Sequence, residues 1–147
     1  SYVKRVTQLK LEAAMLRLKT RNLPKGPVLC ADTTVALGRE ILGKPDNAQD
    51  ALRILKKLSG NTHRVLTAVA IGEGKRRVSS VSISSVTFAS MTSAEMKAYV
   101  ASGDPMGKAG AYSVQGLAAA HIAVIKGSYT GIMGLPLFET ADLLKQI

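Results

Sequence analysis

Apolar side chains recur at helical spacing near the start of the chain. Residues 1–21 carry one every three or four positions, which predicts an amphipathic helix. We expect its buried stripe to be Tyr2, Val6, Leu9, Ala13 and Leu16. Residues 22–27 contain two prolines and a glycine, so this segment is predicted to be a turn that ends the helix.

Three later stretches also have helical periodicity. Residues 46–59 predict a helix with Asp46 as N-cap and Gly60 just past its end. Its expected buried stripe is Ala48, Ala51, Leu52, Leu55 and Leu58. Residues 93–102 predict a third helix, which Thr92 and Glu95 can cap together. Residues 135–147 predict a closing helix.

Shorter apolar runs between the helices predict strands. We expect core strands at 28–31, 63–71, 78–88 and 117–125, with a hairpin turn at 72–75 and a further turn at 127–131. In the run 78–88 the apolar positions change parity at Ser84 and Ser85, which predicts a bulge or bend with the serines on an exposed face.

Composition limits the class of protein. A chain of 147 residues with 46% hydrophobic and 20% charged residues fits one domain with its own core. Its apolar runs are too short to cross a membrane, and we expect no signal peptide. The single cysteine, Cys30, cannot form an internal disulfide, which favours a reducing, cytoplasmic setting.

The net charge of +10 predicts anionic partners such as nucleotides, nucleic acid or acidic surfaces. Seven lysines and arginines face one acid, Glu12, in the first 25 residues, so a nucleic-acid binder is an alternative. Against that alternative, tryptophan is absent and the few aromatic residues are not interleaved with the basic ones. Nucleic acid is therefore the less favoured partner.

Candidate chemistry first appears at Asp32, directly after the strand predicted at 28–31. If Gly38 marks a hairpin, Lys44 returns to the same place. A carboxylate beside a lysine suits a phosphorylated substrate, with the acid holding a metal or activating water. The alternative is an Asx-turn at Asp32 and a solvated Lys44. Lys10, at the edge of the first helix's stripe, can reach a cleft or simply extend into solvent.

The segment 103–116 is a second candidate, because it is too rich in glycine for regular structure and too long for a simple turn. It supplies Lys108, which can hold phosphate, together with Tyr112 and Gln115, whose amide can read a base edge. An ordinary surface loop is the alternative. His63 is interpreted as structural, because no second histidine or cysteine stands at metal-ligand spacing.

Taken together, these segments resemble the Maf family of nucleoside triphosphate pyrophosphatases over essentially the whole chain. The residues that carry the resemblance are Tyr2-Val3-x-Arg5, Leu9-Lys10, Ala31-Asp32-Thr33, Gly43-Lys44-Pro45, Leu58-Ser59-Gly60-x-Thr62-His63-x-Val65-x-Thr67, Lys108-Ala109-Gly110-Ala111-Tyr112-x-x-Gln115-Gly116, Gly127-Ser128-Tyr129 and Gly134-Leu135-Pro136-Leu137. The resemblance implies an α/β fold, with a twisted mixed sheet flanked by helices and a nucleotide-binding cleft.

The same resemblance implies roles for individual residues. Asp32 would be the proton acceptor and a ligand of Mg²⁺ or Mn²⁺, and Thr33 and Gln115 would help to select the base. Lys10, Lys44 and Lys108 would hold the triphosphate. Gln115 matches the branch that acts on dTTP and UTP, whereas the 7-methyl-GTP branch typically has glutamate there. A homodimer is also implied.

The sequence departs from the family pattern at its front. The family begins with a strand and a Ser-x-Ser-Pro-Arg-Arg phosphate loop, but this sequence begins at the first helix, so we expect a Maf-like domain over 1–147 without that loop. Three alternatives accompany the dTTP/UTP reading: 7-methyl-GTP hydrolysis, hydrolysis of inosine or xanthosine triphosphate, and a cell-division (septum formation) regulator without catalysis.

Overall fold

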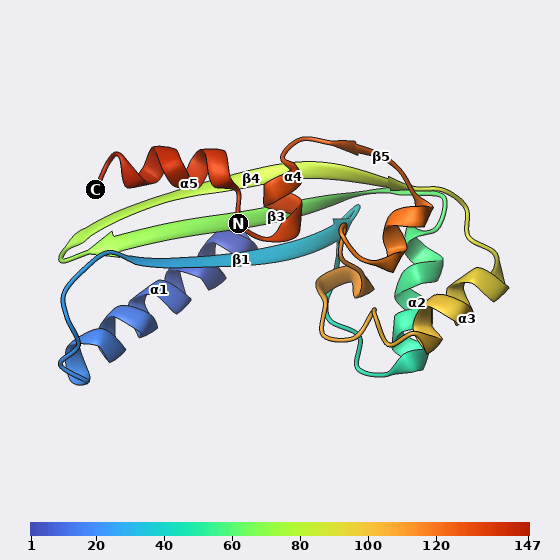
Figure 1. Cartoon of the computed structure of the whole chain (residues 1–147), viewed down its shortest axis with the longest axis horizontal. Helices are drawn as coiled ribbons and strands as arrows, with labels where there is room; N and C mark the ends of the chain where they lie inside the picture. The colour runs from blue at the N-terminus through green and yellow to red at the C-terminus, as the bar shows by residue number, and fades with distance from the viewer.

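A five-stranded sheet forms the spine of the molecule. The computed structural model describes residues 1–147 (Figure 1). Its strands are β1 (Val28–Leu37), β2 (Glu40–Leu42), β3 (Thr62–Glu73), β4 (Arg76–Phe88) and β5 (Ile122–Lys126), in the order β2-β1-β3-β4-β5. Every pair is antiparallel. The α/β fold with a twisted, helix-flanked sheet is therefore confirmed, although no strand pair has the parallel direction that a mixed sheet requires.

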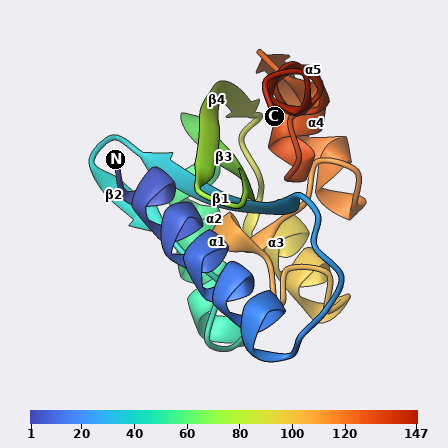
Figure 2. The same cartoon turned by 90° about the vertical axis from the view of Figure 1, so that its left-hand side faces the viewer.

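Helices cover both faces of this sheet. They are α1 (Tyr2–Thr20), α2 (Ala48–Leu58), α3 (Ser93–Ala101), α4 (Tyr129–Met133) and α5 (Leu137–Leu144), with short 3-10 turns η1 (Ala109–Ala111) and η2 (Leu117–His121). Figure 2 shows α1 and α5 on opposite sides of the strands. In Figure 1, α2 and α3 lie at the end of the sheet away from α1 and α5. None of the helices combines the length and the apolarity that a membrane span needs.

The strand register decides which residues share a face. Asp32 lies opposite Ala68 of β3, and its neighbour Thr33 lies opposite Thr67. Because side chains alternate along a strand, these two pairs point to opposite faces. α1 covers the face that carries Asp32, and α4 and α5 cover the face that carries Thr33.

The hydrophobic core has two parts. The larger cluster, of 16 buried residues, lies between the sheet, α2, α3 and the segment after α3 and includes Leu55, Val65 and Phe88. A smaller cluster joins Leu143 of α5 to Val69 and Ile71 of β3. This division leaves the middle of β1 between the two packed ends.

The predicted buried stripe of α1 is wrong. The helix buries Val3, Thr7 and Leu11, and it exposes Tyr2, Leu9 and Leu16. Both stripes have helical spacing, so periodicity alone cannot choose between them. Thr7 tolerates burial because its hydroxyl donates a 2.8 Å hydrogen bond to the Val3 carbonyl.

Several strand predictions also need correction. Asp32 lies in the middle of β1 and not at its end, because Thr33 to Leu37 continue the ladder with β3. The hairpin at Gly38 is confirmed by the β1–β2 pairing. Residues 117–125 do not form a core strand, because η2 is followed by β5, an edge strand with four exposed positions.

The serines of β4 are not exposed as predicted. Ser82 and Ser84 are buried, and the β3–β4 register runs without a bulge there. The irregularity falls instead at Thr87 and Phe88, against β5. Burial is tolerated because the Ser84 hydroxyl accepts a hydrogen bond from the Ser128 amide at 2.9 Å.

Cap predictions had mixed outcomes. The Thr92–Glu95 capping box of α3 is present, and Gly60 has the expected left-handed φ of +68°. The N-cap of α2 is Asn47 and not Asp46, since the Asn47 side chain accepts from the Asp50 amide. The predicted 127–131 turn continues into α4.

Gly110 locks the long loop after α3 onto the sheet. Its amide donates to the Gly43 carbonyl at 3.1 Å, and its φ is +70°. A Cβ there would lie 2.9 Å from both methyl carbons of Val35. The close approach therefore needs a residue without a side chain.

Gly110→Ala should destabilise the fold more than Gly38→Ala. Both glycines have positive φ, but a Cβ at Gly38 would meet nothing within 4 Å. Gly38→Ala should cost about 1–2 kcal/mol for its backbone conformation, and Gly110→Ala about 1–3 kcal/mol more for overpacking. Urea unfolding measures both, and equal losses would show that the contact with Val35 is not tight.

Candidate active site

An ion pair joins α1 to the middle of β1. The Lys10 ammonium lies 2.5 Å from an Asp32 carboxylate oxygen. The Asp32 side chain is 21% exposed and that of Lys10 is 52% exposed, so the pair is open to solvent. Of the residues predicted from the sequence, these two are in direct contact.

Thr33 belongs to a chain of hydroxyls on the opposite face. Its oxygen lies 3.0 Å from that of Thr67, and the Thr67 hydroxyl donates to the Gly131 carbonyl at 2.6 Å. Because the Thr67 hydroxyl donates its only proton to the Gly131 carbonyl, the Thr33 hydroxyl must be the donor to Thr67. The Thr33 oxygen is then left with lone pairs, so it can only accept a further hydrogen bond.

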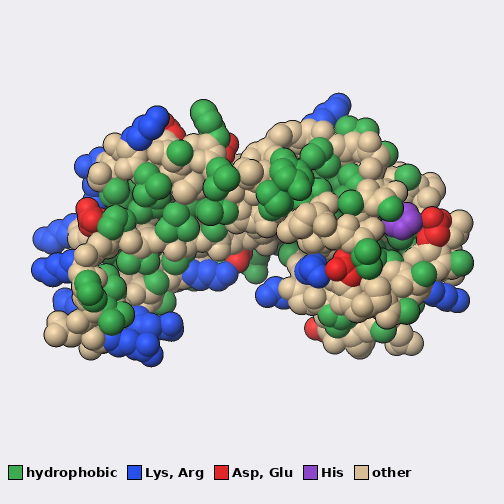
Figure 3. Space-filling view, in the orientation of Figure 1, with side chains coloured by type: hydrophobic (Ala, Val, Ile, Leu, Met, Phe, Trp, Pro, Cys, Tyr) green, Lys and Arg blue, Asp and Glu red, His purple; other side chains and the backbone are tan.

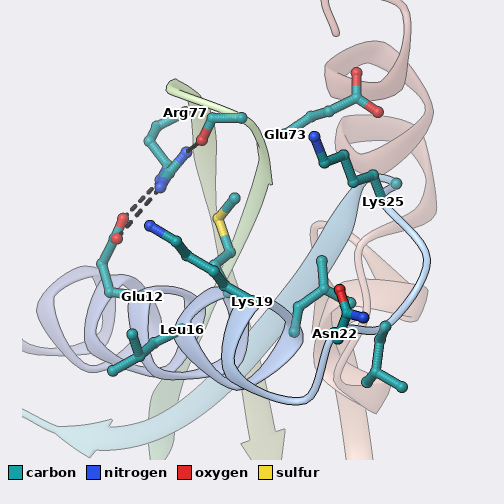
Figure 4. Close-up of a pocket in the computed structure, with 12 residues that line it drawn as sticks. Glu12, Leu16, Lys19, Asn22, Lys25, Glu73 and Arg77 are labelled. Atoms are coloured by element: carbon teal, nitrogen blue, oxygen red, sulfur yellow. Dashed lines mark hydrogen bonds and ion pairs between the residues drawn. The ribbon is translucent and has the colours of Figure 1, made fainter.

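A pocket of about 180 Å³ opens beside Thr33. Its wall also contains Lys108 and Met133, with Val35, Val65, Ala109, Tyr112, Ser113, Val114 and Ile132. The lining is mostly apolar with a few polar groups, as small-molecule pockets generally are. A larger cavity of about 750 Å³ lies between α1 and the β3–β4 turn, and its lining includes none of the predicted site residues (Figure 4).

Lys108 is restrained by an acid that the sequence interpretation missed. Its ammonium donates to the Asp104 carbonyl and lies 3.5 Å from the Asp104 carboxylate. The Tyr99 hydroxyl donates to the same carboxylate at 3.1 Å, and burial together with Asp104 raises the pKa of Tyr99. The four-residue spacing of Asp104 and Lys108 was the available signal.

The other two predicted residues are less enclosed. Lys44 is exposed and forms no ion pair, but the Gly110–Gly43 hydrogen bond fixes its loop to the one that carries Lys108. Gln115 is exposed and does not line the small pocket, although Ser113 and Val114 do. The structure therefore joins the Lys44 loop to the Lys108 loop, and neither Lys44 nor Gln115 lines the pocket.

The outer edge of β1 lies between the Lys10–Asp32 ion pair on one face of the sheet and the small pocket beside Thr33 on the other. β2 pairs only with Val35, Ala36 and Leu37, so β1 before Val35 has β3 on one side and no strand on the other. A ligand that contacts both Asp32 and Thr33 must cross this edge, because the two side chains point to opposite faces.

The family model for Maf-like protein matches residues 1–147. The chain belongs to the Maf-like family. A dTTP/UTP pyrophosphatase of Polaromonas sp. is 65% identical over 145 residues, which are 99% of this chain and 72% of that protein. The dTTP/UTP pyrophosphatases of Albidiferax ferrireducens and Cupriavidus pinatubonensis are 63% and 59% identical, with the same coverage. The family resemblance found in the motifs is confirmed.

His63 supports the pocket wall from behind. Its Nε2 lies 2.5 Å from the Tyr112 hydroxyl, and its ring packs against Tyr112 and Phe88. Burial lowers the pKa of His63 to about 4 and raises that of Tyr112. No partner faces Nδ1, so the contact between Nε2 and the Tyr112 hydroxyl is the one hydrogen bond of the neutral ring. These contacts agree with the structural role expected for His63.

Acid should therefore weaken the fold through His63. The unfolded chain binds a proton below the ordinary pKa of 6.5, whereas the folded chain resists protonation until the pKa of about 4. Stability from the neutral ring is complete above pH 6.5 and decreases by about 2 kcal/mol at about pH 5.

Urea unfolding of the wild type and His63→Gln at about pH 7.5 and about pH 5 measures this effect. The variant should be less stable at the higher pH and should lose about 2 kcal/mol less on acidification. Equal losses in the two proteins would contradict the assignment.

Proposed function

We propose that this chain hydrolyses dTTP and UTP to the monophosphate and pyrophosphate. The observation that carries the proposal is the Lys10–Asp32 pair at the open edge of β1. It occurs in a chain 65% identical to a dTTP/UTP pyrophosphatase. At an exposed strand edge, the carboxylate can accept a proton from water, and the ammonium beside it can bind phosphate oxygens.

The small pocket suits a pyrimidine base. Its volume of about 180 Å³ is large enough to hold a single-ring base. Thymine and uracil carry a ring N–H at N3, whereas cytosine has an acceptor at that position. The Thr33 oxygen, which can only accept, matches this donor.

The reaction needs one proton acceptor and several cations. Asp32 would take a proton from water while the water oxygen forms a bond to the α-phosphorus. The bond between that phosphorus and the α–β bridging oxygen breaks, and pyrophosphate leaves with the electron pair. Lys10, Lys44 and Lys108 would neutralise the charge that develops on the phosphates.

Lys10 and Lys108 change partners in this scheme. Without substrate they contact Asp32 and Asp104 respectively. A triphosphate offers both ammonium groups stronger acceptors, and release of Lys10 leaves the Asp32 carboxylate free to accept a proton. The resting ion pair therefore keeps the acid and the cation in position until the substrate replaces it.

A divalent ion, Mg²⁺ or Mn²⁺, belongs to the proposal. No group of three histidine, cysteine or acidic side chains could enclose an ion. Mg²⁺ is often held by one or two carboxylates together with substrate phosphates, and Asp32 fits that mode as the single protein ligand. When bound, the ion would offset phosphate charge.

We also propose the homodimer that the resemblance implies; sedimentation equilibrium at micromolar concentration tests it.

Asp32→Asn should abolish most of the pyrophosphate release. Loss of a general base costs about 10²–10⁴-fold in rate, and asparagine has the same shape, so the melting temperature should change little. Asp142→Asn, at an exposed acid of α5, is the matched control and should retain full activity. A loss of less than about tenfold would remove Asp32 from this role.

Gln115→Glu should change which base is preferred. An amide both donates and accepts, whereas a carboxylate only accepts, so the ratio of kcat/KM for dTTP to that for 7-methyl-GTP should fall by about tenfold or more. Gln49→Glu, on the exposed side of α2, controls for the added charge. An unchanged ratio would show that Gln115 does not read the base.

A further inference from the structure

The outward face of α1 carries an apolar stripe that the fold does not use. Tyr2, Leu9 and Leu16 are 51%, 70% and 62% exposed. Val6 is partly buried and Ala13 is exposed between them. The helix packs on the sheet with a different stripe, so Tyr2, Leu9, Ala13 and Leu16 point away from the core and Val6 lies at the border.

The spacing of this outward stripe is that of a helix–helix seam. Successive members are separated by four, three, four and three residues, which is the alternation that keeps an apolar line facing a second helix. Single exposed leucines are common on protein surfaces. A continuous line at this spacing matches a helical partner specifically.

The positions that flank the stripe are mainly basic. Arg5, Glu12 and Lys19 follow one side, and Lys10 and Arg17 follow the other. Glu12 is neutralised by Arg77 at 2.6 Å, and Lys10 by Asp32.

Arg5, Arg17 and Lys19 take part in no ion pair within the chain. A second copy of α1 would bring these cations against one another, which disfavours self-association through this face. Acids at the flanking positions of a partner helix would complement them.

A recess adjoins the C-terminal end of the stripe. The cavity of about 750 Å³ is lined there by Leu16, Leu23, Lys19 and Lys25 (Figure 4). Lysines and arginines gather at this end of the molecule (Figure 3). A flat bilayer surface cannot fill a recess, whereas side chains that extend from a protein partner can.

We propose that the outward face of α1 docks an amphipathic helix of a partner protein whose apolar stripe is flanked by aspartate and glutamate. The apolar line supplies the contact area, and the basic flanks select an acidic partner and set its orientation. The inference does not depend on the hydrolytic reaction.

Three synthetic peptides of about three heptads each test the proposal. One has a leucine seam flanked by glutamates, the second has the same seam flanked by lysines, and the third keeps the glutamates but replaces the seam with serine. Fluorescence anisotropy should show micromolar binding of the first peptide, weakened by salt. The other two should bind at least about tenfold more weakly.

Matched variants locate the binding surface. The double variant Leu9→Ser/Leu16→Ser should lose about tenfold or more of the affinity for the first peptide. Leu117→Ser removes a leucine with the same 62% exposure as Leu16 but outside α1, and it should bind like the wild type. Circular dichroism melts establish that all variants are folded.

Other outcomes would overturn the proposal. These are no binding of any peptide, equal binding of the glutamate and lysine peptides, or equal effects of the α1 and Leu117 variants. A dimer that the double variant dissociates would assign the face to a second copy of the chain. Binding to phosphatidylserine vesicles that the double variant abolishes, without peptide binding, would assign it to a membrane surface.

Discussion

The backbone ladder between β1 and β3 fixes the positions of Asp32 and Thr33, two of the proposed site residues. It pairs nine consecutive residues of β1 with β3, from Val28 opposite Gly72 to Ala36 opposite Arg64. A slip of one residue would turn every side chain to the other face. Asp32 would then lose Lys10, and Thr33 would lose the hydroxyl chain to Gly131. The site therefore depends on register more than on any single contact.

Buried hydroxyls strengthen that register from the α4 side. Thr67 of β3 bonds to Gly131, and Ser84 of β4 accepts from Ser128. Each of these groups would be left unsatisfied in the interior if the strands shifted, at a cost of about 1–3 kcal/mol. The small β4 side chains also let α4 approach, since a Cβ at Gly131 would lie 2.7 Å from the Ser82 oxygen.

Much of this structure could be predicted from the sequence, for local reasons. The capping box of α3 and the hairpin at Gly38 depend on neighbouring residues only. The family motifs identified Asp32, Thr33 and Lys108, and the structure places them on or beside one strand edge. Their chemical roles are a separate matter, which the proposed variants address.

What could not be predicted depends on tertiary contacts. Val3 and Leu9 lie on equally periodic stripes of α1, and only the shape of the sheet selects the one that is buried. Ser84 has the polarity of a surface residue, and its burial requires the amide of Ser128, 44 residues away. Asp104 is different, because its partners Tyr99 and Lys108 are close in sequence and the spacing of Asp104 and Lys108 was a usable signal.

Within residues 1–147, the edge of β1 before Val35 has a further consequence for strand pairing. An unpaired strand edge is a template for pairing with another chain, and proteins commonly block such edges with charged side chains. Asp32 and Lys10 place a carboxylate and an ammonium at the centre of this edge. An incoming strand would have to desolvate both charges, which is costly. The pair that we propose for catalysis thus also makes this stretch of β1 a poor template for a chance partner strand.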